Sequence, residues 1–243
     1  MKNNPLNHFI LKRFNSIELN LSAFMKDKNP ERLHRLRVDI KKIRAVFSFA
    51  EKVYNEEFSV SEVGPLFKKT GKIREIQIKI NLLTLFPHQP KRLINQLKKK
   101  ESILSQQLIN SGSHYINVLM KFFKKEHLPH QLPDNYIIVK YFKKEKRKSN
   151  KKLDKKDRDS VHHYRTRIKY LMYLFNALPK IIQKEIDLNK TKINIQQKKL
   201  GEWHDNYSAV YYFTHQHLPK KTAEYIFKLR EIEKKQFNSL FNL

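Results

Sequence analysis

The segment LHRLRVDIKKIR, at residues 33–44, predicts both an α-helix and a candidate binding surface. Leu33, Leu36, Ile40 and Ile43 recur every three or four positions, which is typical of the buried face of an α-helix. A cationic or histidine residue follows each of these four, and at about 100° per residue these side chains form a stripe beside the apolar face. The stripe consists of His34, Arg37, Lys41 and Arg44. Because Val38, Ala45 and Phe49 flank its other side, the stripe is expected to line a crevice between helices.

The whole chain is strongly basic but also rich in apolar residues. Its 243 residues include 51 Lys and Arg against 23 Asp and Glu, and the formal net charge is +28. Hydrophobic residues make up 40%, so the chain is expected to fold around a core rather than remain a disordered polycation. An excess of positive charge this large favours polyanionic partners, namely phosphate polymers, nucleic acid or anionic membrane.

Several classes of protein are excluded or disfavoured by the residues present. No cysteine occurs, which excludes disulfides, thiolate metal ligands and thiol catalysis. Near the N-terminus Lys12, Arg13 and Asn15 interrupt the apolar run that a signal peptide needs. No stretch approaches the length of a membrane span. We therefore expect a cytoplasmic protein without a membrane span or a cofactor.

The spacing of prolines and apolar residues predicts an all-α fold. Only four glycines occur, and the nine prolines fall mostly between segments of helical periodicity, which is typical of long helices joined by short turns. Eight helices are predicted, at about 5–27, 30–53, 62–86, 90–127, 135–154, 157–178, 181–215 and 220–242.

The first four predicted helices resemble the last four. The apolar ladder Leu33, Leu36, Ile40, Ile43 and Phe47 is matched 128 positions later by Val161, Tyr164, Ile168, Leu171 and Phe175. The stripe of His34, Arg37, Lys41 and Arg44, which we call the row, is matched 128 positions later by His162, Arg165, Lys169 and Met172. A second pair of segments, FKKTGKIRE at 67–75 and QKKLGEWHD at 197–205, is offset by 130 positions. The chain is therefore expected to be a single domain, 1–243, made of repeats at about 5–127 and 134–243.

A row of like charges in a crevice needs negative charge nearby, since burial makes the repulsion more costly. Glu75 and Asp205 hold equivalent places, and the simplest expectation is that they pair with Arg37 and Arg165. That pairing leaves most of the row uncompensated, so we also expect an outside anion. Arg and Lys donors match phosphate oxygens well, and the histidines of the row are expected to take up protons when the anion binds.

Other features of the sequence have simpler interpretations. His162 and His163 with Asp159 form a weak metal candidate, because the cations around them oppose metal binding. Gly71 and Gly201 are expected to mark close helix crossings, and Trp203 is interpreted as a packing residue. The Lys-rich tracts at 97–101 and 143–152 are expected to be solvated faces.

With these motifs the sequence resembles the CHAD family, the conserved histidine α-helical domain, over nearly the whole chain. The matching positions are His34, Arg37, Lys41, Lys42, Arg44, Gly71, Arg74, Glu75, His162, Arg165, Lys169, Tyr173, Leu200, Gly201 and Asp205. The resemblance implies two four-helix bundles around a basic central cavity that binds inorganic polyphosphate. It implies as polyphosphate-binding residues His34, Arg37, Lys41, Lys42, Arg44, Lys68, Arg74, His162, Arg165, Lys169 and Lys198.

Three positions depart from the family pattern, so the two halves of the cavity are not expected to be equivalent. Met172 stands where the family usually has Arg, Glu75 replaces Asp, and His204 takes the place that Arg74 has in the first repeat. Many relatives also carry a triphosphate-hydrolysing tunnel domain, whose alternating acidic motif is absent here. No catalytic residue is therefore expected.

Three alternatives to polyphosphate binding remain at this stage. A general RNA- or DNA-binding protein needs exposed rings for base stacking, whereas the aromatic residues mostly follow apolar ladders, Tyr173 being the exception. A phosphohydrolase needs clustered acidic metal ligands, and a purely structural helical protein would need no ligand. Polyphosphate granules are a further candidate partner.

Overall fold

A computed structural model of the chain describes residues 4–125, 128–216 and 220–241. Within these ranges the fold is all-α, with ten α-helices, one short 3₁₀ helix and no strand. The first half comprises α1 (Pro5–Asp27), α2 (Pro30–Tyr54), η1 (Ser61–Val63), α3 (Gly64–Thr84), α4 (Lys91–Asn110) and α5 (Gly112–Lys125). The second half comprises α6 (Asn135–Lys151), α7 (Arg158–Ala177), α8 (Lys180–Glu185), α9 (Lys190–Thr214) and α10 (Lys220–Ser239).

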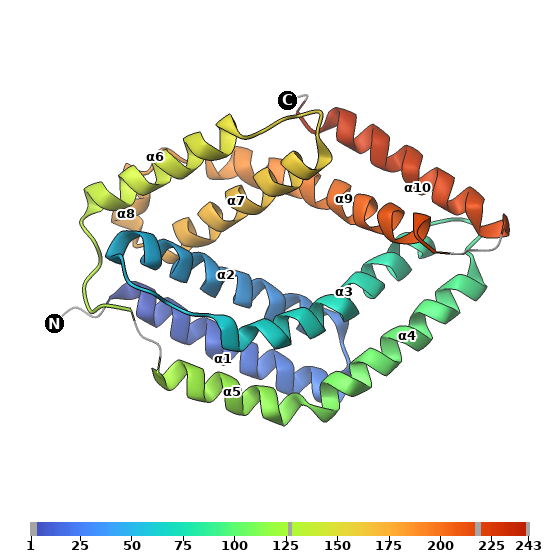
Figure 1. Cartoon of the computed structure of the whole chain (residues 1–243), viewed down its shortest axis with the longest axis horizontal. Coiled ribbons are helices and arrows are strands. Elements are labelled where there is room, and N and C mark those ends of the chain that lie inside the picture. The colour runs from blue at the N-terminus through green and yellow to red at the C-terminus, as the bar shows by residue number, and fades with distance from the viewer. Residues whose placement is uncertain (1–3, 126–127, 217–219, 242–243) are drawn as a thin grey trace.

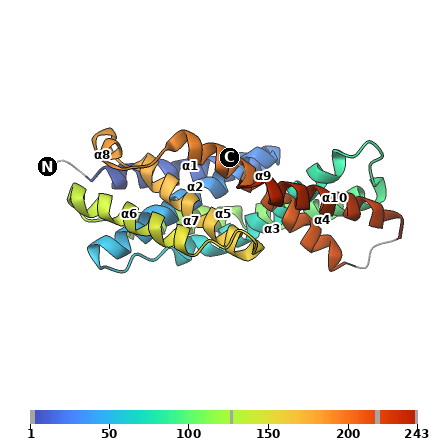
Figure 2. The same ribbon diagram turned by 90° about the horizontal axis from the view of Figure 1, so that it is seen from above.

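The two halves lie side by side in a flattened molecule (Figures 1 and 2). Helices α1 to α5 form one long side, and α6 to α10 form the other (Figure 1). The halves meet through α2, which packs on α7, and through α3, which approaches α9. These four helices carry the sequence motifs that resemble each other, so the fold places the paired motifs along the contact between the halves.

Local sequence signals explain where the helices begin and end. Asn4 and Asn29 each accept a hydrogen bond from the backbone N–H two residues later, at 3.0 and 2.9 Å, and a proline opens the helix that follows. Asp157 caps α7 through the N–H groups of residues 159 and 160. Lys28 and Asn55 adopt left-handed backbone angles, with φ of 52° and 55°, and terminate α1 and α2.

The predicted apolar ladders form the core. All five ladder residues of α2 are at most 1% exposed, and four of the five on α7 are buried, with Tyr164 half-buried. The main core cluster contains residues of both halves. Trp203 is fully buried against Phe237, and its indole N–H donates to Glu233 at 2.8 Å. Its interpretation as a packing residue is therefore confirmed.

The prediction of eight helices, four in each half, was wrong, because two predicted helices are each divided. The segment 90–127 breaks at Ser111, and Gly112 begins α5 where a Cβ would overlap the sulfur of Met25. The segment 181–215 breaks after Glu185, and Asn189 then caps α9 by accepting from the N–H of Lys192. Positions 126–127 and 242 of the predicted helices lie outside the described residues.

Candidate functional site

Helices α2, α3, α7 and α9, which surround the middle of the molecule (Figure 1), line a cavity of about 570 Å³. Most of the cationic side chains that line it belong to α2 and α7. On each of these two helices the cationic residues lie one helical turn apart. Six of the eleven predicted site residues line it: His34, Arg37, Lys41, Arg74, Arg165 and Lys169. The fold thus brings together residues from four helices that are far apart in the sequence.

Arg37 and Lys41 of α2, with Arg165 and Lys169 of α7, form what we call the basic cluster. Burial, with repulsion from neighbouring cations, lowers the pKa of Arg37 to about 10 and that of Lys41 to about 8. Burial and the charge of Arg165 lower the pKa of Lys169 to about 8. The pKa of Arg165 is also lowered by burial. The cluster therefore carries positive charge that the surrounding protein does not stabilise well.

Arg37 is held in place by contacts with α3. Its Nη1 donates hydrogen bonds to the backbone oxygen of Phe67 and to Oγ1 of Thr70, the latter at 3.4 Å. The guanidinium also lies 4.1 Å from the centroid of the Phe67 ring, and that of Arg44 lies 4.3 Å from the same centroid. One aromatic ring therefore lies in cation–π contact with two arginines, which restrains both.

Gly71 and Gly201 lie beside the two arginines of the basic cluster. A Cβ at Gly71 would be 2.8 Å from Nη1 of Arg37, whereas a Cβ at Gly201 would be 3.8 Å from Nη2 of Arg165. The expected close approach at these glycines is therefore an approach of an arginine to the backbone. It is tight at Gly71 and an ordinary van der Waals contact at Gly201.

The predicted ion pairs of Arg37 with Glu75 and of Arg165 with Asp205 are not formed, so this prediction was wrong. Both carboxylates line the cavity, but neither forms an ion pair within 4.0 Å with these arginines in the described structure. They act at longer range, raising the pKa of each arginine against the stronger effect of burial. The basic cluster therefore has no carboxylate in contact among the described residues.

The structure does not place the other predicted site lysines in this cavity. Lys42, one residue beyond Lys41 and so about 100° around the helix, pairs with Asp39 at 2.9 Å. Asp39 also contacts Arg13 at 3.3 Å. Lys68 and Lys198 are exposed and are not among the lining residues. The resemblance to the family had implied all three lysines as binding residues, and none of them lines this cavity.

Arg44 lines a separate cavity of about 350 Å³, together with Phe47 and Tyr170. The predicted row is therefore divided between two cavities, although the guanidinium groups of Arg37 and Arg44 contact the same Phe67 ring.

The two predicted histidines occupy different environments. His34 lines the cavity, and burial together with the charge of Arg74 lowers its pKa. His162 stacks on His204, with ring centroids 4.5 Å apart and an interplanar angle of 21°. It is His204 that lines the cavity, while His162 lies behind it with Nδ1 buried and without a hydrogen-bond partner among the described atoms. Burial, then His204, lowers the pKa of His162 to about 4.

Sequence reasoning missed the end of the cavity formed by α3 and the C-terminal half of α9. Lys79 lines it, four residues after Glu75. Tyr207, Tyr211 and Tyr212 line it from α9, and His215 lines it from the C-cap position that follows α9. Their spacing continues a stripe that begins at His204, whereas the sequence predicts that most tyrosines belong to core ladders. The helical spacing of this stripe was the signal available in the sequence.

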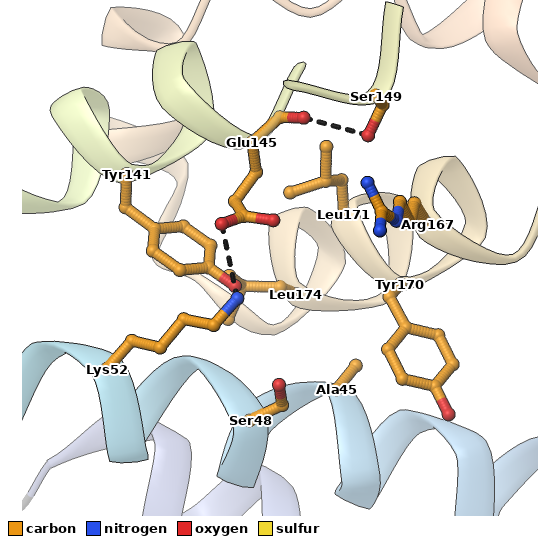
Figure 3. Close-up of a pocket in the computed structure, with 10 residues that line it drawn as sticks. All are labelled: Ala45, Ser48, Lys52, Tyr141, Glu145, Ser149, Arg167, Tyr170, Leu171 and Leu174. Carbon is orange, nitrogen blue, oxygen red and sulfur yellow. Dashed lines mark hydrogen bonds and ion pairs between the residues drawn. The ribbon is translucent and has the colours of Figure 1, made fainter. Parts of the chain in front are cut away.

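A small pocket between α2, α6 and α7 is a different kind of site (Figure 3). Lys52 pairs with Glu145 across it at 3.1 Å, and Ser149 donates to the backbone oxygen of Glu145 at 2.8 Å. Arg167 lines it from α7, and its Nη1 is buried without a hydrogen-bond partner among the described atoms. At about 60 Å³ the pocket has room for only a few water molecules.

The rings of His162 and His163, the weak metal candidate with Asp159, have centroids 5.9 Å apart and are tilted by 56°. Within the described ranges, no group of three or more His, Cys, Asp or Glu side chains is placed to hold a metal ion. No helix in those same ranges has the length and apolar character that a membrane crossing requires.

Comparison with known proteins connects this architecture to a family. The family model for the CHAD domain matches residues 8–212. The fold is similar to the crystal structure of the CHAD domain from the plant Ricinus communis, with a TM-score of 0.69 and 15% sequence identity. The similarity covers 97% of this chain and 87% of the plant chain. A search of curated proteins finds no match. Because the family model spans most of its length, the chain belongs to the CHAD family.

Proposed function

We propose that this chain binds inorganic polyphosphate in the cavity between α2, α3, α7 and α9, and that it does so without catalysis. The observation that carries the proposal is the basic cluster, in which four half-buried cations share one cavity with no contacting carboxylate among the described residues. A bound polyanion would supply the missing negative charge, and it would restore the lowered pKa values of the two lysines.

The arrangement of the cations favours a chain of phosphates over a single small anion. Arg37 and Lys41 are separated by one turn, as are Arg165 and Lys169, and one turn advances about 6 Å along each helix. Two such rows on facing helices offer charge along a line, which suits a ligand with a repeating charge. Membership of the CHAD family supports the same ligand class.

The test is a titration with long-chain polyphosphate at moderate salt, competed by RNA with the same number of phosphates. A variant with Arg37, Lys41, Arg165 and Lys169 changed to Ala is expected to lose the preference for polyphosphate while remaining helical. A matched control variant changes two exposed arginines and two exposed lysines to Ala, at Arg92, Lys144, Arg147 and Lys156. Both variants remove the same charge, so only the cavity variant is expected to lose the preference.

Two results would overturn the proposal. If both variants lose the same affinity, binding follows net charge and not the cavity. If RNA competes as well as polyphosphate, the chain is a general nucleic-acid binder, the alternative that the basic composition also allows.

A further inference from the structure

The cavity extends beyond the basic cluster into an end with different chemistry. Along α9 and just beyond its C-terminus, this end is lined by Tyr207, Ser208, Tyr211, Tyr212, His215 and Gln216. A bare phosphate chain makes no specific use of aromatic rings, whereas rings and amide or hydroxyl groups are what proteins use to hold a nucleobase. The residues of this end are therefore unexplained by polyphosphate binding alone.

Tyr211 and His215 form an aromatic pair in this end of the cavity. Tyr211 is 61% exposed, and its ring centroid lies 4.4 Å from that of His215, with the rings tilted by 40°. Nδ1 of His215 donates a hydrogen bond to the backbone oxygen of Tyr211 at 2.7 Å, which fixes the imidazole and leaves Nε2 as an acceptor in the neutral ring. An accessible ring backed by a fixed imidazole offers a stacking surface for a base.

Lys79 links the aromatic end to the basic cluster. It is only 5% exposed, and its Nζ lies 3.8 Å from the centroid of the Tyr212 ring. No carboxylate of the described residues lies within ion-pair distance of it, although Glu75 is near enough to raise its pKa against the larger effect of burial. The buried ammonium of Lys79 therefore favours a ligand that places negative charge next to the aromatic residues.

The dimensions of the cavity also suit a small ligand whose two ends differ in chemistry. From His204 to His215 the lining advances eleven residues along α9, which is about 16 Å at 1.5 Å per residue. The volume of about 570 Å³ lies within the range of about 300–1,000 Å³ that small-molecule sites occupy. Gln216 and Ser208 add hydrogen-bonding groups beside the aromatic pair.

Taken together, these contacts lead us to propose that the cavity binds a nucleoside 5′-polyphosphate, with its phosphates on the basic cluster and Lys79 and its base against Tyr211 and His215. This inference rests on the proposed function, because the same basic cluster holds the phosphates. It adds a base-binding half to the site and so names a second class of ligand.

Calorimetric titrations with ATP and with inorganic tripolyphosphate, at equal ionic strength and without divalent cations, test this directly. Tripolyphosphate has as many phosphates as ATP and no base. ATP is expected to bind at least about fivefold more tightly than tripolyphosphate. A factor of about five corresponds to the lower end of the range for stacking one base on an aromatic side chain. The double variant Tyr211→Ala/His215→Ala is expected to lose that advantage while its affinity for tripolyphosphate stays unchanged. The matched control, Tyr136→Ala/His8→Ala, removes an exposed tyrosine and an exposed histidine elsewhere.

The outcomes separate this inference from the proposed function. If long-chain polyphosphate and tripolyphosphate bind but ATP binds no more tightly, the nucleotide inference fails and polyphosphate binding stands. If none of the three binds, both fail. A double variant that keeps the full preference for ATP, or an RNA oligonucleotide without a 5′-polyphosphate that competes as well as ATP, would also overturn the inference.

Discussion

The guanidinium of Arg37 occupies the space that a side chain at Gly71 would need. A Cβ there would lie 2.8 Å from Nη1, closer than real Cβ atoms approach their neighbours. Arg37 is fixed in that position by hydrogen bonds to the backbone of Phe67 and to Thr70. The absence of a side chain on α3 therefore determines where a cation of α2 lies in the cavity.

Gly71→Ala is expected to weaken polyphosphate binding by about tenfold, because it displaces the Arg37 guanidinium and one charged hydrogen bond contributes about 1.5 kcal/mol or more. Gly201→Ala is the matched control, since its Cβ makes only an ordinary contact at 3.8 Å from Arg165. That variant is expected to keep its affinity and to gain about 0.8–1 kcal/mol of stability from helix propensity. Titration and denaturant unfolding of both variants measure these effects. Equal affinity of the two variants would contradict the positioning role of Gly71.

The fold was largely predictable because its signals are local. Helical periodicity, the Asn–Pro sequences at 4–5 and 29–30 and the scarcity of glycine lead to the helix positions without knowledge of the tertiary structure. The division at Gly112 was missed although Ser111 and Gly112 are residues typical of turns, because Leu108, Tyr115 and Leu119 keep a helical spacing across it. The short α8 was missed for a related reason, since apolar spacing continues through the break at 186–189.

The candidate site was less predictable than the fold. Helical spacing was sufficient to group Arg37 with Lys41 and Arg165 with Lys169. The pairing of Lys42 with Asp39 is an i,i+3 contact within α2, which helical spacing permits but does not single out. The position of Arg44 beside the Phe67 ring of α3 and in another cavity depends on a contact between helices, about which a single sequence contains no direct information.

Affinity for polyphosphate is expected to be highest below about pH 8 and to fall as the pH rises further. Lys41 and Lys169 have pKa values of about 8 in the free protein, and a bound anion raises them, so binding takes up protons above pH 8. Each lysine contributes up to about a tenfold fall per pH unit above that value. Calorimetry at pH 9 in buffers of different ionisation enthalpy measures the proton uptake.

Lys41→Arg/Lys169→Arg is the control for this pH dependence, because arginine stays charged across the whole range. The double variant is expected to bind with nearly constant affinity between pH 7 and pH 9. If its affinity falls as steeply as that of the wild type, groups other than these lysines control binding.

The stability of the free protein is expected to rise as the pH increases from about 8 toward 10.5. Both lysines have lower pKa values in the folded state than the usual 10.5, so the unfolded chain binds more protons in this window. Lys41→Met/Lys169→Met is therefore expected to be more stable than the wild type at pH 7, by on the order of 2 kcal/mol. The difference should shrink toward zero near pH 10, where the wild-type lysines are neutral. Urea unfolding at the two pH values tests this, and a double variant less stable than the wild type at pH 7 would contradict it.

The salt dependence of binding distinguishes residues inside the cavity from exposed ones on the same helix. For a single-stranded polyanion, log K changes with log salt by about 0.7 for each phosphate engaged. Arg74→Ala removes a lining cation of α3 and is expected to reduce the slope by about that amount. Lys68→Ala removes an exposed cation of α3 that does not line the cavity, and the slope should not change. If the two variants reduce the slope equally, the polyanion contacts the outer face of α3 as well, and the phosphates are not confined to the cavity.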